Sequence, residues 1–261
     1  MGRMVRRSGL VMKEFRRDAH VVETVPGALL RDMRFSLGMD TGKHFAAILC
    51  GITRDSRRYV LGEVATCEAS ITESCGEVKE MVLRVLADEF SVVEWEDAKE
   101  IVDIFMADPA SQHKEDLMEH LDVAVGYEQL ELLGSIDRVR EWMKEGALFF
   151  VQSGLYEESE GRGILYEIGR YAWKTSVHKQ ESFSAQSQAP RKVDDHSIDA
   201  LRFGLVPLDG LGPLAEVECR RDFNEAFAVH QRSAMMDGLK AAFRGESQLD
   251  FQEFSRVHGY E

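Results

Sequence analysis

The stretch FSLGMDTGKHFAAILCGITRDSRRYVLGEVAT, residues 35–66, decides the fold of this chain. Apolar residues dominate three segments of it, at 35–39, 46–53 and 59–66, and the polar residues 54–58 separate the last two. Short apolar runs bounded by polar turn residues are typical of β-strands. Three consecutive strands with tight connections predict an antiparallel meander at the start of the domain.

Helices and strands then alternate along the chain. Val78, Met81, Val82 and Val85 recur at helical spacing, which predicts a helix over about 72–88. Further strands are predicted at 101–106, 123–125 and 148–151, and helices at 111–121, 136–144 and 158–173. A loop over 175–192 and a helix that carries Asp195 follow. This order predicts an α/β fold of the ribonuclease H-like kind, with a mixed sheet of five to six strands flanked by helices.

The predicted domain spans residues 34–206, between a basic N-terminal arm and linker (1–33) and a short helical C-terminal tail (207–261). The first seventeen residues contain six Arg or Lys and one Glu, which predicts an exposed arm. They lack the apolar core of a secretory signal, and no apolar run approaches the roughly 20 residues of a membrane span. The four cysteines form no CxxC pair. We therefore expect an intracellular protein without disulfides or membrane contact.

The charge of the chain is unevenly distributed. The net charge of −14 argues against a protein that holds nucleic acid by its overall charge. Residues 88–131 contain fourteen acidic residues and two lysines, whereas residues 162–192 contain six basic and two acidic residues. A polyanionic substrate is therefore expected to approach from the side of residues 162–192.

An acidic cluster begins the last predicted helix of the domain. Asp194, Asp195, His196 and Asp199 fall within six residues, and helical spacing lets Asp195 or His196 converge with Asp199. Two carboxylates 4 Å apart repel by roughly 1 kcal/mol in water and roughly 4 kcal/mol near a protein surface, a repulsion that bound Mg²⁺ or Mn²⁺ removes. The alternative is that these acids only complement the positive end of a helix.

Two distant acidic residues favour the metal site. Asp40 and Asp108 each follow a predicted strand, and sites in open α/β sheets gather beyond the carboxyl ends of strands. Alone, each is commonly a turn or helix cap. Together with the cluster that contains Asp195 and Asp199, they predict oxygen ligands for two Mg²⁺ or Mn²⁺ ions, an arrangement that hydrolyses phosphodiesters.

Three segments resemble the motifs of the nuclease domain of the large terminase subunit of tailed phages. They are FSLGMDTG (35–42), ADPA (107–110) and DHSIDALRF (195–203), and EIGRYAW (167–173) resembles a helix of that family. The resemblance covers about residues 10–206. It implies a metal-dependent endonuclease that cuts concatemeric viral double-stranded DNA during genome packaging, in the cytoplasm of the bacterial host.

The resemblance also implies roles for residues. Asp40 matches the ligand that bridges both ions, and Asp108 matches a second acidic ligand. Asp195, His196 and Asp199 match positions that members use in differing combinations; we expect Asp195 and Asp199 to bind metal, and His196 to bind metal or to position water or phosphate. The implied partners are a packaging ATPase domain or chain, the portal protein and the small terminase subunit.

The expected DNA contacts are basic residues. They are Lys174, Lys179, Arg191 and Lys192, with Arg54, Arg57 and Arg58 as a second group.

Other interpretations remain open at this level. The packaging motif G-x-x-x-x-G-K-[ST] is missing from the sequence, which fits a separate nuclease domain, a split-gene product or a degraded gene. A Holliday-junction resolvase-like nuclease would use the same carboxylates. A non-catalytic DNA-binding or portal-docking module would use none of them. Residues 37–42 also resemble the first phosphate loop of the actin, sugar-kinase and chaperone ATPase group, which needs a second copy of the fold.

Overall fold

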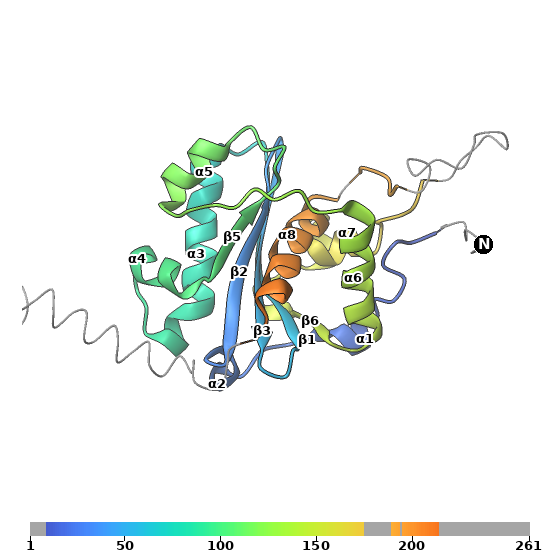
Figure 1. Cartoon of the computed structure of the whole chain (residues 1–261), viewed down its shortest axis with the longest axis horizontal. Coiled ribbons are helices and arrows are strands. Elements are labelled where there is room, and N and C mark those ends of the chain that lie inside the picture. The colour runs from blue at the N-terminus through green and yellow to red at the C-terminus, as the bar shows by residue number, and fades with distance from the viewer. Residues whose placement is uncertain (1–8, 175–188, 194, 214–261) are drawn as a thin grey trace, which may run out of the picture. The chain divides into compact units, whose positions relative to one another are not determined.

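The predicted meander forms the centre of the sheet in a computed structural model, which describes residues 9–174, 189–193 and 195–213. Its strands are Met33–Asp40 (β2), His44–Thr53 (β3) and Arg58–Cys67 (β4). β2 pairs antiparallel with β3 from Met33 opposite Thr53 to Asp40 opposite Ala46. Nearly every residue of β2 and β3 is buried, because helices cover both faces of the sheet (Figure 1).

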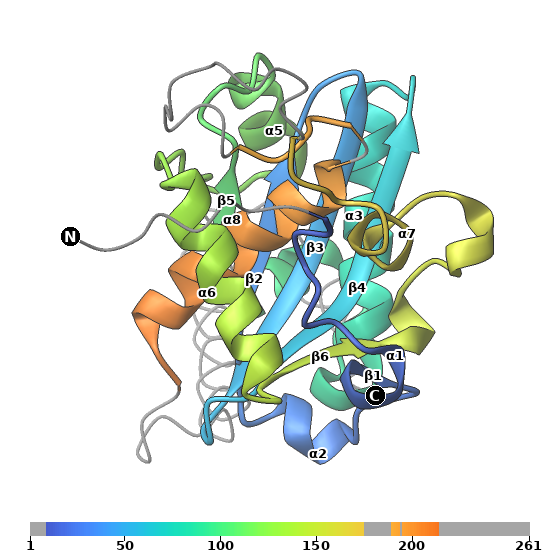
Figure 2. The ribbon, with the colours of Figure 1, turned by 90° about the vertical axis from the view of Figure 1, so that its right-hand side faces the viewer.

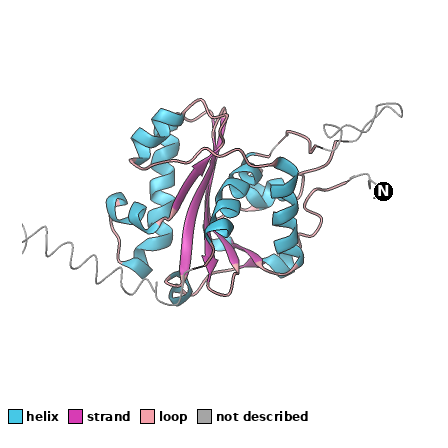
Figure 3. Cartoon of the chain, viewed as in Figure 1, coloured by secondary structure: helices cyan, strands magenta, loops and turns pink. Residues whose placement is uncertain are grey.

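Three shorter strands complete a mixed six-stranded sheet in the order β1-β6-β4-β3-β2-β5. They are Val21–Val22 (β1), Ile104–Ala107 (β5) and Leu148–Val151 (β6). β5 runs parallel to β2 on one side of the meander, and β6 runs parallel to β4 on the other. The sheet confirms the predicted fold class (Figure 3).

Helices form a layer on each side of the sheet (Figure 1). One layer contains Ile71–Phe90 (α3), Trp95–Ala98 (α4) and Lys114–Leu121 (α5). The other contains Leu132–Lys144 (α6), Ile164–Ile168 (α7) and His196–Leu211 (α8), with α8 lying across β2 and β3 (Figure 2). Two short helices, Arg17–His20 (α1) and Gly27–Leu30 (α2), precede the meander. In the part of the chain that the structure describes, no helix is long and apolar enough to cross a membrane.

The N-terminal residues from 9 onward belong to the domain, so the prediction of an exposed arm is wrong for them. Val11 and Met12 are buried in the core, and the backbone N–H of Val11 donates to Tyr171 O at 2.7 Å. Residues of β1 then add an edge strand to the sheet beside β6. At the other end, α8 continues to Leu211, five residues past the predicted boundary at 206. Residues 214–261 lie outside the described part.

Two predicted elements differ from the structure. The predicted strand at 123–125 is reduced to a single bridge between Met106 and Gly126. The predicted helix over 158–173 is interrupted, because Gly161 and Gly163 adopt positive φ angles of 72° and 82°. Positive φ breaks an α-helix, and glycine adopts it without steric cost. Only the short helix α7 remains of that prediction, preceded by one 3-10 turn at Glu158–Glu160.

Candidate active site

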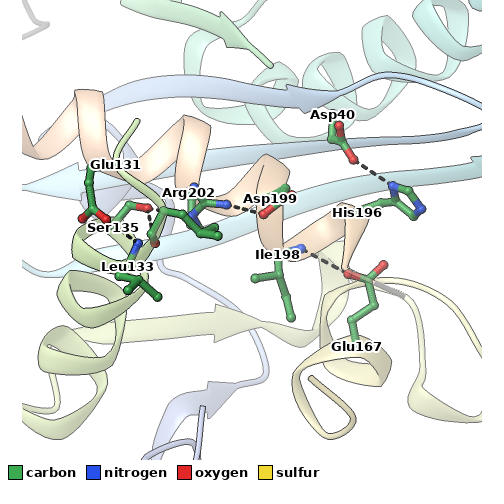
Figure 4. Close-up of polar contacts among 10 residues, drawn as sticks. Asp40, Glu131, Leu133, Ser135, Glu167, His196, Ile198, Asp199 and Arg202 are labelled. Atoms are coloured by element: carbon green, nitrogen blue, oxygen red, sulfur yellow. Dashed lines mark hydrogen bonds and ion pairs between the residues drawn. The ribbon is translucent and has the colours of Figure 1, made fainter. Parts of the chain in front are cut away.

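The last residue of β2 and the first residue of α8 meet in a hydrogen-bonded pair. Asp40 Oδ2 accepts a hydrogen bond from His196 Nδ1 at 2.8 Å (Figure 4). The Asp40 side chain is 12% exposed and that of His196 36% exposed. The hydrogen bond to Asp40 raises the pKa of His196, although burial acts in the opposite direction. The Asp40 carboxylate therefore lies beside a partly exposed imidazole at the end of the sheet where β2 ends.

Two glycines bring α8 close enough to β2 for this pair to form. A Cβ at Gly38 would overlap the carbonyl oxygen of Ala200 and the amide nitrogen of Gly204. Gly204 faces Gly38 from the helix, and its carbonyl accepts a hydrogen bond from Ser36 Oγ at 2.8 Å. Backbone contacts backbone here, and any side chain would push the helix outward.

Asp195 and Asp199 lie at the start of α8, and the pKa values of both are raised. Burial raises the pKa of Asp195, and repulsion from Asp40 adds to the effect. Burial also raises the pKa of Asp199, to about 6, and Asp195 and Asp40 both contribute. Asp195 is the N-cap residue of α8, yet its side chain makes no capping hydrogen bond. Three carboxylates thus share one poorly solvated region.

Asp108 lies at the same edge of the sheet, one strand away from Asp40. It directly follows β5, and its backbone N–H donates to the carbonyl oxygen of Met39 at 3.1 Å. Its Oδ1 accepts the N–H of Ala110 at 2.8 Å, so this carboxylate also shapes its own loop. A hydrogen bond between Thr41 and Ser111 joins the loops that follow β2 and β5.

The four carboxylates have the chemistry of a site for a hard divalent cation, which prefers oxygen ligands. The repulsion among Asp40, Asp195 and Asp199 is what a cation would relieve. They are not yet assembled as a coordination shell: among the described residues, which exclude Asp194, no three His, Cys, Asp or Glu side chains converge closely enough to hold a metal. Asp40 and Asp199 instead have protein partners, His196 and Arg202.

Arg202 anchors Asp199 to a neighbouring helix. Its side chain is 4% exposed, forms an ion pair with Asp199 and donates from Nε to Ser135 Oγ of α6 at 2.8 Å. A buried guanidinium needs such partners. We did not predict Arg202 as a site residue, although it falls inside the motif at 195–203. Its spacing of three from Asp199 indicates that the two residues share a helix face, but this spacing does not indicate that the pair is buried.

Two buried glutamates that we did not predict as site residues support the helices of the site. Glu63 of β4 accepts the N–H of Tyr156 at 2.8 Å and of Ile164 at 2.7 Å, and so caps the start of α7. Glu167 of α7 accepts the N–H of Ile198 at 3.1 Å, and so caps the start of α8. Burial raises the pKa of each to about 7. The signal for Glu63 is a carboxylate inside the apolar run 59–66; the signal for Glu167 is its place in the EIGRYAW segment.

One member of the first group of expected DNA contacts, Lys192, lies near the site. Lys174, Arg191 and Lys192 are exposed, and the charge of Lys192 lowers the pKa of Asp195. Lys179 lies outside the described residues.

The second group lies at the opposite end of the strands from Asp40. Arg54 and Arg57 are in the turn between β3 and β4, and Arg58 is the first residue of β4. Arg54 and Arg57 are exposed there and form ion pairs with Asp32 and Asp55. Arg58 is buried, is ion-paired with Asp209 and stacks 4.4 Å from the centre of the Trp142 ring. The expectation that Arg58 offers a surface contact is therefore wrong, and Arg54 and Arg57 do not flank Asp40.

Comparisons with known proteins identify the fold. No family model and no curated protein matches the chain. The large terminase of a thermophilic bacteriophage matches with a TM-score of 0.56 and 19% identity, over 78% of this chain and 45% of that one. The nuclease domain of the P22 large terminase matches with a TM-score of 0.53 and 13% identity, over 82% and 96%. The chain thus spans less than half of the thermophilic phage protein and resembles its fold, which confirms the predicted ribonuclease H-like architecture.

Proposed function

We propose that this chain is a metal-dependent endonuclease that cuts concatemeric viral double-stranded DNA during genome packaging. The observation that carries the proposal is the placement of Asp40 at the end of β2, where it pairs with His196 at the start of α8 between Asp195 and Asp199, beside the strand that leads to Asp108. Two further points support a nuclease. The chain is similar in fold to two phage terminases, one of them a nuclease domain. A group of carboxylates that binds divalent metal ions also suits phosphodiester hydrolysis.

Each site residue has a proposed task. Asp40, Asp108, Asp195 and Asp199 would hold two Mg²⁺ or Mn²⁺ ions, and such ions would activate a water molecule and stabilise the leaving oxygen. His196 orients Asp40 through Nδ1 and would position water or phosphate. Arg202 fixes the carboxylate of Asp199, and Glu167 fixes the first turn of α8.

The proposed setting is a viral packaging complex in the bacterial cytoplasm. Its other components would be a packaging ATPase domain or chain, the portal protein and the small terminase subunit. DNA would approach from the side of the exposed basic residues Lys174, Arg191 and Lys192, of which Lys192 lies near Asp195. Five of the fourteen acidic residues between 88 and 131 belong to α4 and α5, in the opposite layer, where they would repel DNA.

A plasmid-cleavage assay tests the proposal. We expect wild-type protein to cut in Mn²⁺ or Mg²⁺ and to stop in EDTA. Asp40→Asn should lower the rate roughly 100-fold or more, because it replaces a charged ligand by a neutral one. Asp88→Asn is the matched control: Asp88 is an exposed carboxylate of α3, on the opposite face of the sheet (Figure 1). Equal cutting by wild type and Asp40→Asn, or cutting that persists in EDTA, would reject the site.

A further inference from the structure

A cleft of about 240 Å³ lies next to the Asp40–His196 pair. Its walls are the ends of β3 and β4, the segment that leads into α7, and the first turn of α8. These strand ends are on the same edge of the sheet as Asp40, because His44 pairs with Cys67 and Asp40 pairs with Ala46. His196 contributes to the cleft and to the pair with Asp40, so the cleft opens directly beside the candidate active site.

Aromatic rings line this cleft. The rings of His44 and His196 stack with their centroids 5.0 Å apart and their planes at 24°. Tyr166 of α7 lines the cleft as well and is half-buried, with Arg170 packed 3.9 Å from its ring centre. Rings of this kind form the platforms on which nucleotides pack in proteins that bind single strands.

Arg162 gives the cleft a fixed positive charge. Its guanidinium stacks 3.9 Å from the ring centre of Tyr156, and its Nη1 donates to Ala65 O at 3.1 Å. Its ion pair with Glu160 is long, at 3.4 Å, and both side chains are more than 40% exposed. Such exposed pairs are weak, so a phosphate can compete for the guanidinium.

Glu167 is the carboxylate among the residues that line the cleft. Its Oε2 accepts the N–H of Ile198, so it is directed at the start of α8 (Figure 4). The groups that a ligand could contact therefore include one guanidinium, two imidazoles and a phenol ring. This set matches the phosphate, sugar and base of a nucleotide.

We propose that this cleft binds one nucleotide of the DNA strand that is cut, with its phosphate at Arg162 and its sugar and base against His44 and Tyr166. The proposal rests on the proposed nuclease function and specifies where its substrate lies. At 240 Å³ the cleft is smaller than most drug-sized sites, which measure roughly 300–1,000 Å³, and a duplex is far larger. One nucleotide of one strand is the unit that fits. Its position beside His196 makes it the neighbour of the scissile phosphate.

The first test is the affinity for a fluorescein-labelled 30-base-pair duplex, measured by anisotropy in EDTA so that no cutting occurs. We expect Tyr166→Leu to weaken binding roughly 5- to 100-fold, the range for loss of one stacking contact. Arg162→Ala should weaken binding by a similar factor, because it removes a charge-assisted contact to the phosphate. Tyr166→Phe keeps the ring and should stay within about 2-fold of wild type. Arg84→Ala is the charge control, because Arg84 is an exposed arginine of α3 on the other face of the sheet (Figure 1).

The second test needs no substitution in the cleft. Cys67 lines the cleft and is exposed, whereas Cys50 and Cys75 are buried. A Cys219→Ser variant removes the remaining cysteine of the sequence. Saturating duplex should then slow the alkylation of Cys67 by N-ethylmaleimide at least several-fold.

The outcomes separate this proposal from the proposed function. If wild type cuts DNA but Cys67 stays unprotected and the cleft variants bind like wild type, the cleft is not the nucleotide site and the nuclease stands. If wild type neither binds nor cuts DNA in Mn²⁺, both proposals fail. Thermal unfolding of each variant identifies any loss of affinity that comes from misfolding. For such a variant, the protection of Cys67 from alkylation decides whether the cleft binds DNA.

Discussion

Asp195 and Asp199 are both candidate metal ligands, but their surroundings differ. Asp199 is ion-paired with Arg202, which is almost fully buried, whereas the Asp195 side chain makes no capping hydrogen bond. Breaking a buried ion pair from one side costs about 3–5 kcal/mol, because the other charge stays buried without a partner. Removing a carboxylate that is buried beside other carboxylates has no such penalty. At the start of α8, Asp199 therefore supports the buried Arg202, whereas the charge of Asp195 is mainly unfavourable when no metal is bound.

This contrast predicts opposite effects of two similar substitutions. In EDTA, Asp199→Ala should destabilise the domain by about 3 kcal/mol and lower its Tm by roughly 6–12 °C, because the buried Arg202 loses the group that accepts its hydrogen bond. Asp195→Asn should leave Tm unchanged or raise it slightly, because burial and Asp40 both disfavour the charge. Both variants should lose most of the Tm increase that Mn²⁺ gives the wild type. Differential scanning fluorimetry with and without Mn²⁺ measures all of these. A larger loss of stability for Asp195→Asn than for Asp199→Ala would contradict this division of roles.

At the scale of elements, buried carboxylates connect the helices of the site in series. Glu63 in β4 caps α7, and Glu167 in α7 caps α8, which carries His196 and the acidic residues. A helix N-terminus has N–H groups without partners inside the helix, and a carboxylate that accepts them also complements the helix dipole. The orientation of the first turn of α8 therefore depends on the sheet through two successive caps.

Removing the Glu167 cap should lower the cleavage rate by more than the loss of folded protein explains. Glu167→Ala should destabilise the domain by about 1–3 kcal/mol and should also lower the cleavage rate and the Mn²⁺ affinity of the protein that remains folded. Glu131→Ala is the matched control. Glu131 caps α6 by accepting the N–H groups of Leu133 and Gly134, and α6 carries no candidate ligand. If both variants lose stability but cut at the wild-type rate per folded molecule, Glu167 is only a structural cap.

At the scale of the whole molecule, the raised pKa values make stability depend on pH. Asp199 has a pKa of about 6, against an ordinary 3.8, and Glu63 and Glu167 have pKa values of about 7, against 4.5. The folded protein therefore binds more protons than the unfolded chain between about pH 4 and 7. The stability from these groups is complete below about pH 4 and is lost as the pH rises through 6–7.

Bound metal should reverse this trend, because metal requires the charged carboxylates. We expect the difference between Tm in Mn²⁺ and Tm in EDTA to be small at pH 5.5 and to grow towards pH 8, with the cleavage rate increasing over the same range. Asp40→Asn should flatten the difference across the whole series. Thermal unfolding in matched buffers from pH 5.5 to 8 provides the measurement. A metal effect that is largest at pH 5.5 would exclude a site built from these acids.

The sequence by itself determined the central strands, two of the long helices and the positions of the acidic residues of the candidate site. Apolar runs bounded by polar turns are local patterns, so the meander at residues 35–66 was predictable, as were the helices α3 and α6. Asp40 and Asp108 were predictable as neighbours, because parallel strands bring their carboxyl ends to one edge of a sheet. Position along the chain and elementary geometry were sufficient for both inferences.

Only the tertiary structure decided which partner each of these residues has. Val11 and Met12 are buried because residues far away in the sequence cover them, so a basic composition did not reveal their place in the core. Likewise Arg58 looks like a surface cation in its polar turn, yet it is buried against Asp209 and Trp142. Burial, caps and ion pairs depend on the three-dimensional surroundings of a side chain, and these bring together residues that no local pattern relates.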